Sequence, residues 1–304
     1  MRPLLTVLVL VLFAAACGGD NGGSTAAPTR TSSPSVARPT RSAVPTPALS
    51  PTPSPETRAR TPTPPRPDAP LYIALGDSLS YGVSASDRFT TAFVPLVAAS
   101  LPAGTGLLNL GHSGDDSEEI VRHGHLDQAI AEITSRNGDS DPDNDVVLVT
   151  LEIGGNDLLD LFFDYVVPGT CPTLVESLQR PECIRILGDT LDNFAPNLEL
   201  VMDRLREADP DLNIVLMTLY NPFSAKIEVF DPFGILSLEG MPDTPFPEGI
   251  NDFVRAQAAA SGAKLADVYP EFVGKGPEYI SMDVIHPNDT GYRVMADVVI
   301  DALQ

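Results

Sequence analysis

Five short apolar runs alternate with longer helix-like segments between residues 71 and 268. Strands of a buried parallel sheet read as near-continuous apolar runs, and a crossover segment must separate consecutive parallel strands. The alternation therefore predicts an α/β domain in which helices cover both faces of a parallel sheet. We expect the strands at residues 71–75, 106–110, 146–153, 213–219 and 264–268.

Apolar stripes and capping residues predict the helices between these strands. Asp87 is expected to cap a helix whose stripe is Phe89, Phe93, Val94, Val97 and Ala98. Asn156 and Asp157 are expected to cap another, and Pro287 to lie in the first turn of a final helix that runs to residue 302. The other helices are expected at residues 118–122, 125–136, 184–208 (interrupted near Pro196) and 248–260.

The first 16 residues differ from the rest of the chain. A basic residue, Arg2, precedes an apolar run of 13 residues at 4–16, LLTVLVLVLFAAA. A bilayer span needs roughly 18 or more apolar residues, so this run favours a cleaved secretory signal peptide. Small residues followed by Cys17 and Gly18 resemble the lipobox of bacterial lipoproteins, which implies a diacylated Cys17 at the membrane. The alternative is an ordinary signal peptide that is cleaved after Ala16.

Residues 18–69 contain 12 Pro and 16 Ser or Thr among 52 residues. Such a segment has too few large apolar residues to bury a core, so we expect a disordered tether. The predicted organisation is a signal peptide at 1–16, a lipidated cysteine and tether at 17–69, and a folded domain at 70–304. The protein would thus be exported from a bacterial cell, and the lipid anchor would be its one contact with the membrane.

The folded domain is strongly acidic. The whole chain has a net charge of −22, and residues 70–304 carry 12 basic and 38 acidic residues, a net charge of −26. Such a domain repels nucleic-acid phosphates and anionic lipid headgroups, so neither is an expected partner. Apolar residues make up 43% of the chain, enough for one sizeable core, and we expect a monomer.

Two cysteines remain if Cys17 is lipidated. Cys171 and Cys183 form an even pair in an exported protein, which predicts a disulfide between them. The alternative is a pair of buried free thiols.

Four polar blocks lie at the predicted strand ends or before the last helix. Gly76-Asp77-Ser78-Leu79 follows the first strand, GHSGD with Gly114 follows the second, and Gly-Gly-Asn156-Asp157 follows the third. Asp283 and His286 precede the final helix. Taken singly, each block has a simple structural explanation: a turn at Ser78, a helix cap at Asn156, a satisfied imidazole at His286. Ser113 in GHSGD does not fit the G-x-S-x-G nucleophile elbow, because its second glycine comes one residue too early.

Together, and in this order, the blocks resemble those of the GDSL/SGNH hydrolase family over about residues 71–304. The resemblance implies a flavodoxin-like, three-layer α/β/α fold with a five-stranded sheet. It implies Ser78 as the nucleophile, with Asp283 and His286 completing a triad. The Ser78 backbone N–H, Gly114 and Asn156 would form the oxyanion hole, and neither a metal nor a cofactor is expected.

Two other groups of residues could suggest a metal, and neither is complete in the sequence. Asp139, Asp141, Asp143 and Asp145 alternate as in a Ca²⁺ loop. They lack the glycine and the glutamate that such a loop needs, so a solvated turn is expected. His123 and His125 could ligate a metal, but the sequence identifies no third ligand, so exposed residues at a helix end are expected.

These observations favour an exported serine esterase or lipase that cleaves carboxylic esters through an acyl-enzyme. Two long connections, at 162–184 and 220–249, flank the predicted site, and the second is rich in Phe, Leu and Ile. We expect it to line an acyl pocket or form a lid, although these side chains could instead cap the core. One alternative is a carbohydrate O-acetylesterase that acts on envelope glycans. The other is a non-catalytic binding lipoprotein of the cell surface.

Overall fold

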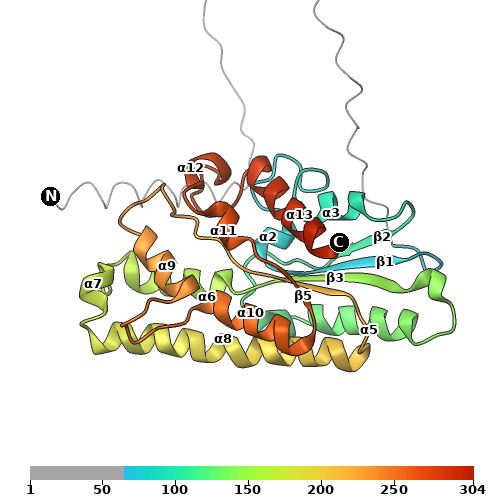
Figure 1. The fold of residues 1–304 in the computed structure, drawn as a ribbon, viewed down its shortest axis with the longest axis horizontal. Helices are drawn as coiled ribbons and strands as arrows, with labels where there is room; N and C mark the ends of the chain where they lie inside the picture. Colours follow the sequence, from blue (N-terminus) through green and yellow to red (C-terminus); the bar gives the residue numbers. More distant parts are fainter. Residues whose placement is uncertain (1–64) are drawn as a thin grey trace, which may run out of the picture. The chain divides into compact units, whose positions relative to one another are not determined.

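A parallel five-stranded sheet forms the centre of the domain, and its strand order is β2-β1-β3-β4-β5 (Figure 1). The computed structural model describes residues 65–304, so Cys17 and the predicted signal peptide and most of the tether lie outside the described residues. The strands are β1 (Leu71–Gly76), β2 (Gly106–Asn109), β3 (Val146–Glu152), β4 (Ile214–Met217) and β5 (Lys264–Ala266). All neighbouring strands pair in parallel, which confirms the predicted α/β class.

Helices cover both faces of the sheet, because the side chains of each strand point alternately to either face. On β1, Leu71, Ile73 and Leu75 enter one core, whereas Tyr72 and Ala74 enter the other. The first core is covered by α5 (His125–Asn137), α8 (Pro181–Ala208) and α10 (Ile250–Ser261). The second is covered by α3 (Phe93–Ser100) and α13 (Asp289–Leu303), on the opposite side of the sheet in Figure 1.

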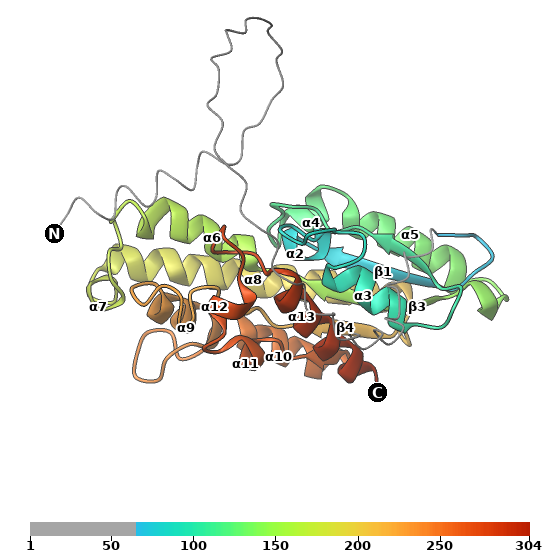
Figure 2. The same ribbon diagram turned by 90° about the horizontal axis from the view of Figure 1, so that it is seen from above.

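Shorter elements surround these layers. The helices α6, α7 and α9 lie together at one end of the domain in both views (Figures 1 and 2). The shorter elements are α2 (Ser78–Tyr81), α4 (Glu119–Arg122), η2 (Pro142–Asn144), α6 (Gly155–Leu161), the π-helix η3 (Phe162–Val166), α7 (Leu174–Ser177), α9 (Asp231–Glu239), α11 (Tyr269–Phe272) and α12 (Gly276–Tyr279).

The strand order places the two most important loops side by side. β2, the next strand along the chain, lies on one side of β1, and β3 lies on the other side. The strand order reverses at this point, and ligands of such sheets bind there, outside the carboxyl ends of the strands. Gly76 at the end of β1 pairs with Glu152 at the end of β3. Gly76 has φ +148°, and a Cβ there would lie 2.2 Å from the Glu152 carbonyl oxygen, so only glycine permits this close approach.

The structure corrects two predicted helices. Asp87 caps a turn instead of a long helix: its carboxylate accepts from the Phe89 N–H, Phe89 stays exposed, and α3 begins only at Phe93. Pro196 does not interrupt α8, which runs unbroken through 28 residues from Pro181. A proline inside a helix removes one hydrogen bond at a cost of about 3 kcal/mol, and the long buried face of α8 offsets that cost.

Two helices also begin at other residues than predicted, so Asn156 and Asp157 do not cap one of them and Pro287 does not lie in the first turn of the other. Gly154 is the N-cap of α6, so Asn156 lies inside its first turn and its side chain is free for other contacts. Asn288 caps α13 by accepting from the N–H groups of Thr290 and Gly291, and Pro287 lies just before the helix.

The two long connections contain regular structure. The 162–184 connection contains η3, α7 and the start of α8, and the 220–249 connection contains α9. Cys171 and Cys183 form a disulfide with a Cα–Cα distance of 5.9 Å, as predicted. Among residues 65–304, no helix, including the long α8, combines the length and apolar character needed to cross a membrane.

Candidate active site

Ser78 lies at the start of α2, directly after β1, and its side chain is 6% exposed. Asp77 caps α2 because its carboxylate accepts from the Leu79 N–H at 2.9 Å. The sharp turn from strand to helix therefore fixes the position of Ser78 at the edge of the sheet. Ser78 therefore lines a pocket instead of packing in the core.

The structure brings Ser78, His286 and Asp283 into one chain of hydrogen bonds. His286 Nε2 lies 2.9 Å from Ser78 Oγ, although 208 positions separate the two residues. His286 Nδ1 lies 2.8 Å from Asp283 Oδ2. A proton on Nδ1 would be held by the carboxylate, which leaves the Nε2 lone pair directed at the serine hydroxyl.

Asp283 is held by more than the imidazole. Its carboxylate accepts from the Ser84 hydroxyl at 2.5 Å, the Ser281 hydroxyl at 2.7 Å and the His286 backbone N–H at 2.9 Å. Burial alone would raise the pKa of Asp283, but the hydrogen bonds from His286, Ser84 and Ser281 outweigh it and hold the pKa well below its ordinary value. The carboxylate thus stays ionised beside the imidazole at neutral pH.

The three predicted oxyanion donors lie after three neighbouring strands: Ser78 after β1, Gly114 after β2 and Asn156 after β3. Ser78 N–H and Gly114 N–H donate no hydrogen bond to any other group among residues 65–304, so both remain available to a ligand. Asn156 Nδ2 donates to the Asp115 carbonyl at 2.8 Å and lies 3.4 Å from Asp77 Oδ2. The Asp115 contact anchors the Asn156 amide and ties the loop after β2 to the start of α6.

Asp77, which precedes Ser78, and Glu152 form a buried carboxyl pair that was not predicted from the sequence. Asp77 is 2% exposed and Glu152 is fully buried. Burial raises the pKa of Asp77 to about 6. Burial and the charge of Asp77 raise the pKa of Glu152 well above its ordinary range, so Glu152 carries a proton at neutral pH. No sequence signal distinguished Glu152, because a lone acid at a strand end is common.

An apolar pocket opens beside the Ser78–His286 pair. It contains about 740 Å³ of space including its open mouth, and Ser78 and His286 are among its lining residues. Apolar side chains from α6, η3, α9 and the loop after β4 line the rest: Leu158, Leu159, Leu161, Phe162, Val166, Leu219, Tyr220, Pro222, Phe223, Phe233 and Leu238. The 220–249 connection therefore contributes to a pocket wall, one of the two roles expected for it.

The rejected candidates lie apart from this pocket. Ser113 is exposed and does not line it. Asp139 and Asp141 accept hydrogen bonds from backbone N–H groups of their own turn, as expected of a solvated turn.

Comparisons with known proteins agree with this geometry. The profile of the GDSL-like Lipase/Acylhydrolase family matches residues 74–294. Spore germination lipase LipC of Bacillus licheniformis is 25% identical over 229 residues, which cover 74% of this chain and 92% of that protein. The lipase Lip_vut3 from a goat rumen metagenome has a TM-score of 0.57 and 23% identity, over 77% of this chain and 97% of that one. The extracellular lipase of Streptomyces rimosus has a TM-score of 0.55 and 21% identity, over 77% of this chain and all of that one (100%). Both of these structures have the same fold as this chain.

Proposed function

Because the chain belongs to the GDSL-like lipase/acylhydrolase family and is a GDSL-type ester hydrolase, we propose that Ser78, His286 and Asp283 are its catalytic triad. One observation carries the proposal: the 2.9 Å contact between Ser78 Oγ and His286 Nε2 in line with the 2.8 Å contact between His286 Nδ1 and Asp283. A serine hydroxyl is a weak nucleophile until a base in hydrogen-bond reach removes its proton.

Acylation follows from these positions. Ser78 Oγ attacks the ester carbonyl carbon while His286 Nε2 takes the hydroxyl proton. The negative charge that develops on the carbonyl oxygen is met by the N–H groups of Ser78 and Gly114 and by the Asn156 amide. When the tetrahedral intermediate collapses, His286 returns the proton to the departing alcohol and leaves the acyl group on Ser78.

Deacylation repeats the sequence with water. His286 takes a proton from the water as the water oxygen attacks the acyl carbonyl carbon. When the tetrahedral intermediate collapses, the bond between that carbon and Ser78 Oγ breaks, His286 returns the proton to Ser78 Oγ, and the carboxylic acid leaves. Asp283 stays ionised throughout and stabilises the imidazolium that forms in both halves of the reaction. Removing one oxyanion donor of this kind typically costs about 10²–10³ in kcat, so the Asn156 amide would be a major contributor.

The substrate class that fits best is an ester of a medium or long acyl chain. The pocket beside Ser78 is lined by apolar side chains that can bury the methylene groups of such a chain, at about 0.8 kcal/mol for each buried CH₂. An acetyl group would leave most of this apolar wall unused. The proposal therefore favours acyl esters over the acetylated glycans considered as the alternative.

We also propose that the first 17 residues direct the protein out of the cell. An apolar run followed by Ala-Ala-Ala-Cys17 supports export and lipid attachment at Cys17. Fractionation of the expressing bacterium tests this: the wild-type chain should sediment with membranes, and Cys17→Ser should not. Wild-type chain in the soluble cytoplasmic fraction would contradict export.

Labelling with a fluorophosphonate tests the triad. The reagent should modify the wild-type chain and the exposed-serine control Ser113→Ala equally, and should not modify Ser78→Ala. Hydrolysis of p-nitrophenyl butyrate should fall in parallel, by at least about 10³-fold. Undiminished labelling of Ser78→Ala would overturn the assignment of the nucleophile. A wild-type chain that neither reacts with the fluorophosphonate nor hydrolyses any ester would favour the binding lipoprotein instead.

A series of p-nitrophenyl esters tests the substrate class. We expect kcat/KM to rise from acetate to octanoate. A clear preference for acetate would contradict the acyl pocket and favour the carbohydrate O-acetylesterase.

A further inference from the structure

Three of the four histidines in the chain converge on one buried carboxylate outside the proposed active site. His112 lies in the loop after β2, His123 ends α4, and His125 begins α5. Asp115 lies between them and is 1% exposed. The sequence offered His123 and His125 as possible ligands without a third and favoured exposed residues at a helix end. The His125 side chain is instead only 22% exposed, because it lies against Asp115, and the fold supplies two more candidate ligands.

The distances show how tightly this His–Asp cluster (His112, Asp115, His123 and His125) is assembled. Asp115 Oδ1 lies 2.6 Å from His112 Nδ1 and 2.9 Å from His123 Nδ1. Asp115 Oδ2 lies 3.4 Å from His125 Nε2. One ligand atom from each of the four side chains lies within 4.8 Å of every other. Ligand atoms about 2.0–2.2 Å from a tetrahedral Zn²⁺ would be about 3.3–3.6 Å apart, so small side-chain movements would suffice.

Asp115 provides an independent sign of an additional ligand. Its Oδ2 is fully buried and has no hydrogen-bond partner among residues 65–304, although it faces the His125 ring. Leaving a buried carboxylate oxygen without a partner costs free energy, and a bound cation would satisfy it. Hydrogen bonds to imidazoles account for Oδ1 and leave Oδ2 unexplained.

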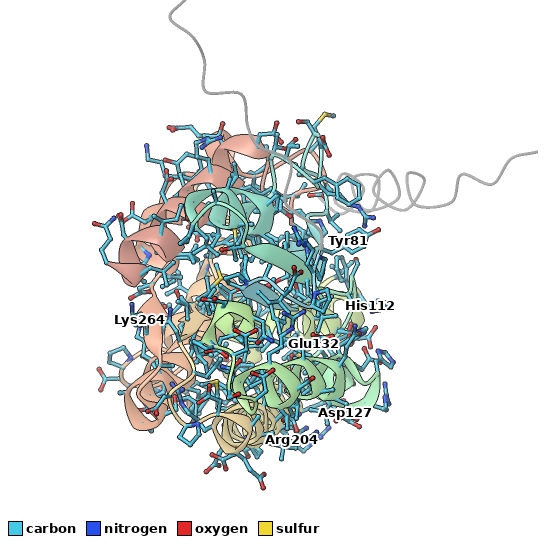
Figure 3. All side chains as sticks on the ribbon, turned by 90° about the vertical axis from the view of Figure 1, so that its right-hand side faces the viewer. Tyr81, His112, Asp127, Glu132, Arg204 and Lys264 are labelled. Carbon is cyan, nitrogen blue, oxygen red and sulfur yellow. A yellow bond between two sulfur atoms is a disulfide. The ribbon has the colours of Figure 1, made fainter. Side chains whose placement is uncertain are left out.

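The backbone is shaped to bring the four side chains together. Gly114 has φ +99° between His112 and Asp115, and Gly124 has φ +82° between His123 and His125. These left-handed positions favour glycine and reverse the chain locally, so that the residues on either side can face one point. His112 keeps its side chain 55% exposed at the rim, on the same side of the domain as Tyr81 in Figure 3, which gives an ion a route from solvent.

We propose that His112, Asp115, His123 and His125 form a Zn²⁺ site with four protein ligands. Three imidazoles and one carboxylate suit Zn²⁺, whereas Ca²⁺ and Mg²⁺ prefer sites built from oxygen. Four protein ligands fill a tetrahedral shell and leave no open position for substrate, so the ion is structural. The serine mechanism proposed above needs no metal, and the two sites are separate sets of residues.

The ion would also fix part of the oxyanion hole; this consequence alone rests on the proposed function. Gly114 lies between two of the ligands, and the Asp115 carbonyl accepts from Asn156 Nδ2 at 2.8 Å. Holding Asp115 therefore holds the anchor of the Asn156 amide.

Zinc titration of the full chain tests the proposal. Protein treated with a chelator and dialysed should bind one Zn²⁺ per chain in isothermal titration calorimetry, and excess zinc should raise its Tm by about 5 °C or more. Ca²⁺ and Mg²⁺ should do neither. His125→Gln and the more exposed His112→Gln should each weaken zinc binding by about 100-fold or more, and Asp115→Asn should do the same.

His286→Ala is the matched control, because it removes the one histidine outside the cluster. It should bind zinc with wild-type affinity. The proposal is overturned if the wild type binds no zinc, if His125→Gln and His112→Gln bind it normally, or if His286→Ala abolishes binding. Circular dichroism confirms that each variant folds. These readouts do not use ester hydrolysis, so they stand or fall independently of the proposed activity.

Discussion

Removing the Cys171–Cys183 disulfide should lower the free energy of unfolding by an amount set by the length of the loop that it closes. The two cysteines are 12 positions apart, and a loop of that length corresponds to about 3 kcal/mol of loop-closure free energy. For a domain of this size, about 1 kcal/mol corresponds to roughly 2–4 °C, so we expect Tm to fall by about 6–12 °C.

The same change should affect the substrate pocket. Both cysteines are buried in a cluster with Phe162 and Phe233, which also line the pocket. Loosening this wall should reduce octanoate hydrolysis more than acetate hydrolysis, because only the longer chain needs the far wall.

Calorimetry of the Cys171→Ser/Cys183→Ser double variant provides the measurement. Wild-type protein unfolded in the presence of a phosphine reductant is the control, and its Tm should approach that of the variant. A fall in Tm of less than about 2 °C would contradict the loop-closure estimate. Equal losses of acetate and octanoate activity would contradict a role for the disulfide in the pocket wall.

Three further substitutions test single contacts. Ser84→Ala removes a hydrogen bond to Asp283, so the pKa of Asp283 should rise toward its ordinary value, and kcat/KM should fall about fivefold after allowance for the partly exposed carboxylate; Ser86→Ala, which contacts Asp289 instead, should leave kcat/KM unchanged, and an equal fall in both variants would contradict a role for the Ser84 contact. Glu152→Gln should be more stable than the wild type in urea at pH 8 but not at pH 4, because the folded wild type retains a proton that the unfolded chain releases as the pH rises above about 4.5; equal pH dependence would contradict this. Ser237→Phe should fill the pocket and reduce kcat/KM for octanoate about tenfold, with acetate hydrolysis nearly unchanged, and a uniform loss would argue against an acyl pocket.

The sequence predicted the sheet well because strand signals are local. Each apolar run between residues 71 and 268 contains one strand of the structure, with ends within two residues. The helix after Asp87 failed for a tertiary reason: Phe89 continues the apolar stripe, but its side chain stays largely exposed instead of entering the core, and the chain turns there.

Contacts between segments that are distant in the chain could not be predicted from the sequence. Ser84 and Asp283 are 199 positions apart, and no local pattern indicates that the loop after α2 reaches the Asp283 carboxylate. His112 and Asp115 likewise join His123 and His125 only because the loop after β2 lies against α4 and α5. The spatial meeting of Ser78 and His286, by contrast, was expected from the family resemblance, and the structure has the two in contact.

A crystal structure of the protein inactivated by an octyl fluorophosphonate would give the sharpest test of Ser78 as the nucleophile. We expect a bond between phosphorus and Ser78 Oγ, with the phosphoryl oxygen within about 3 Å of the N–H groups of Ser78 and Gly114 and of Asn156 Nδ2. The octyl chain should lie in the pocket beside Phe162 and Phe233. Phosphorus on another residue, or a phosphoryl oxygen directed away from all three donors, would contradict the account.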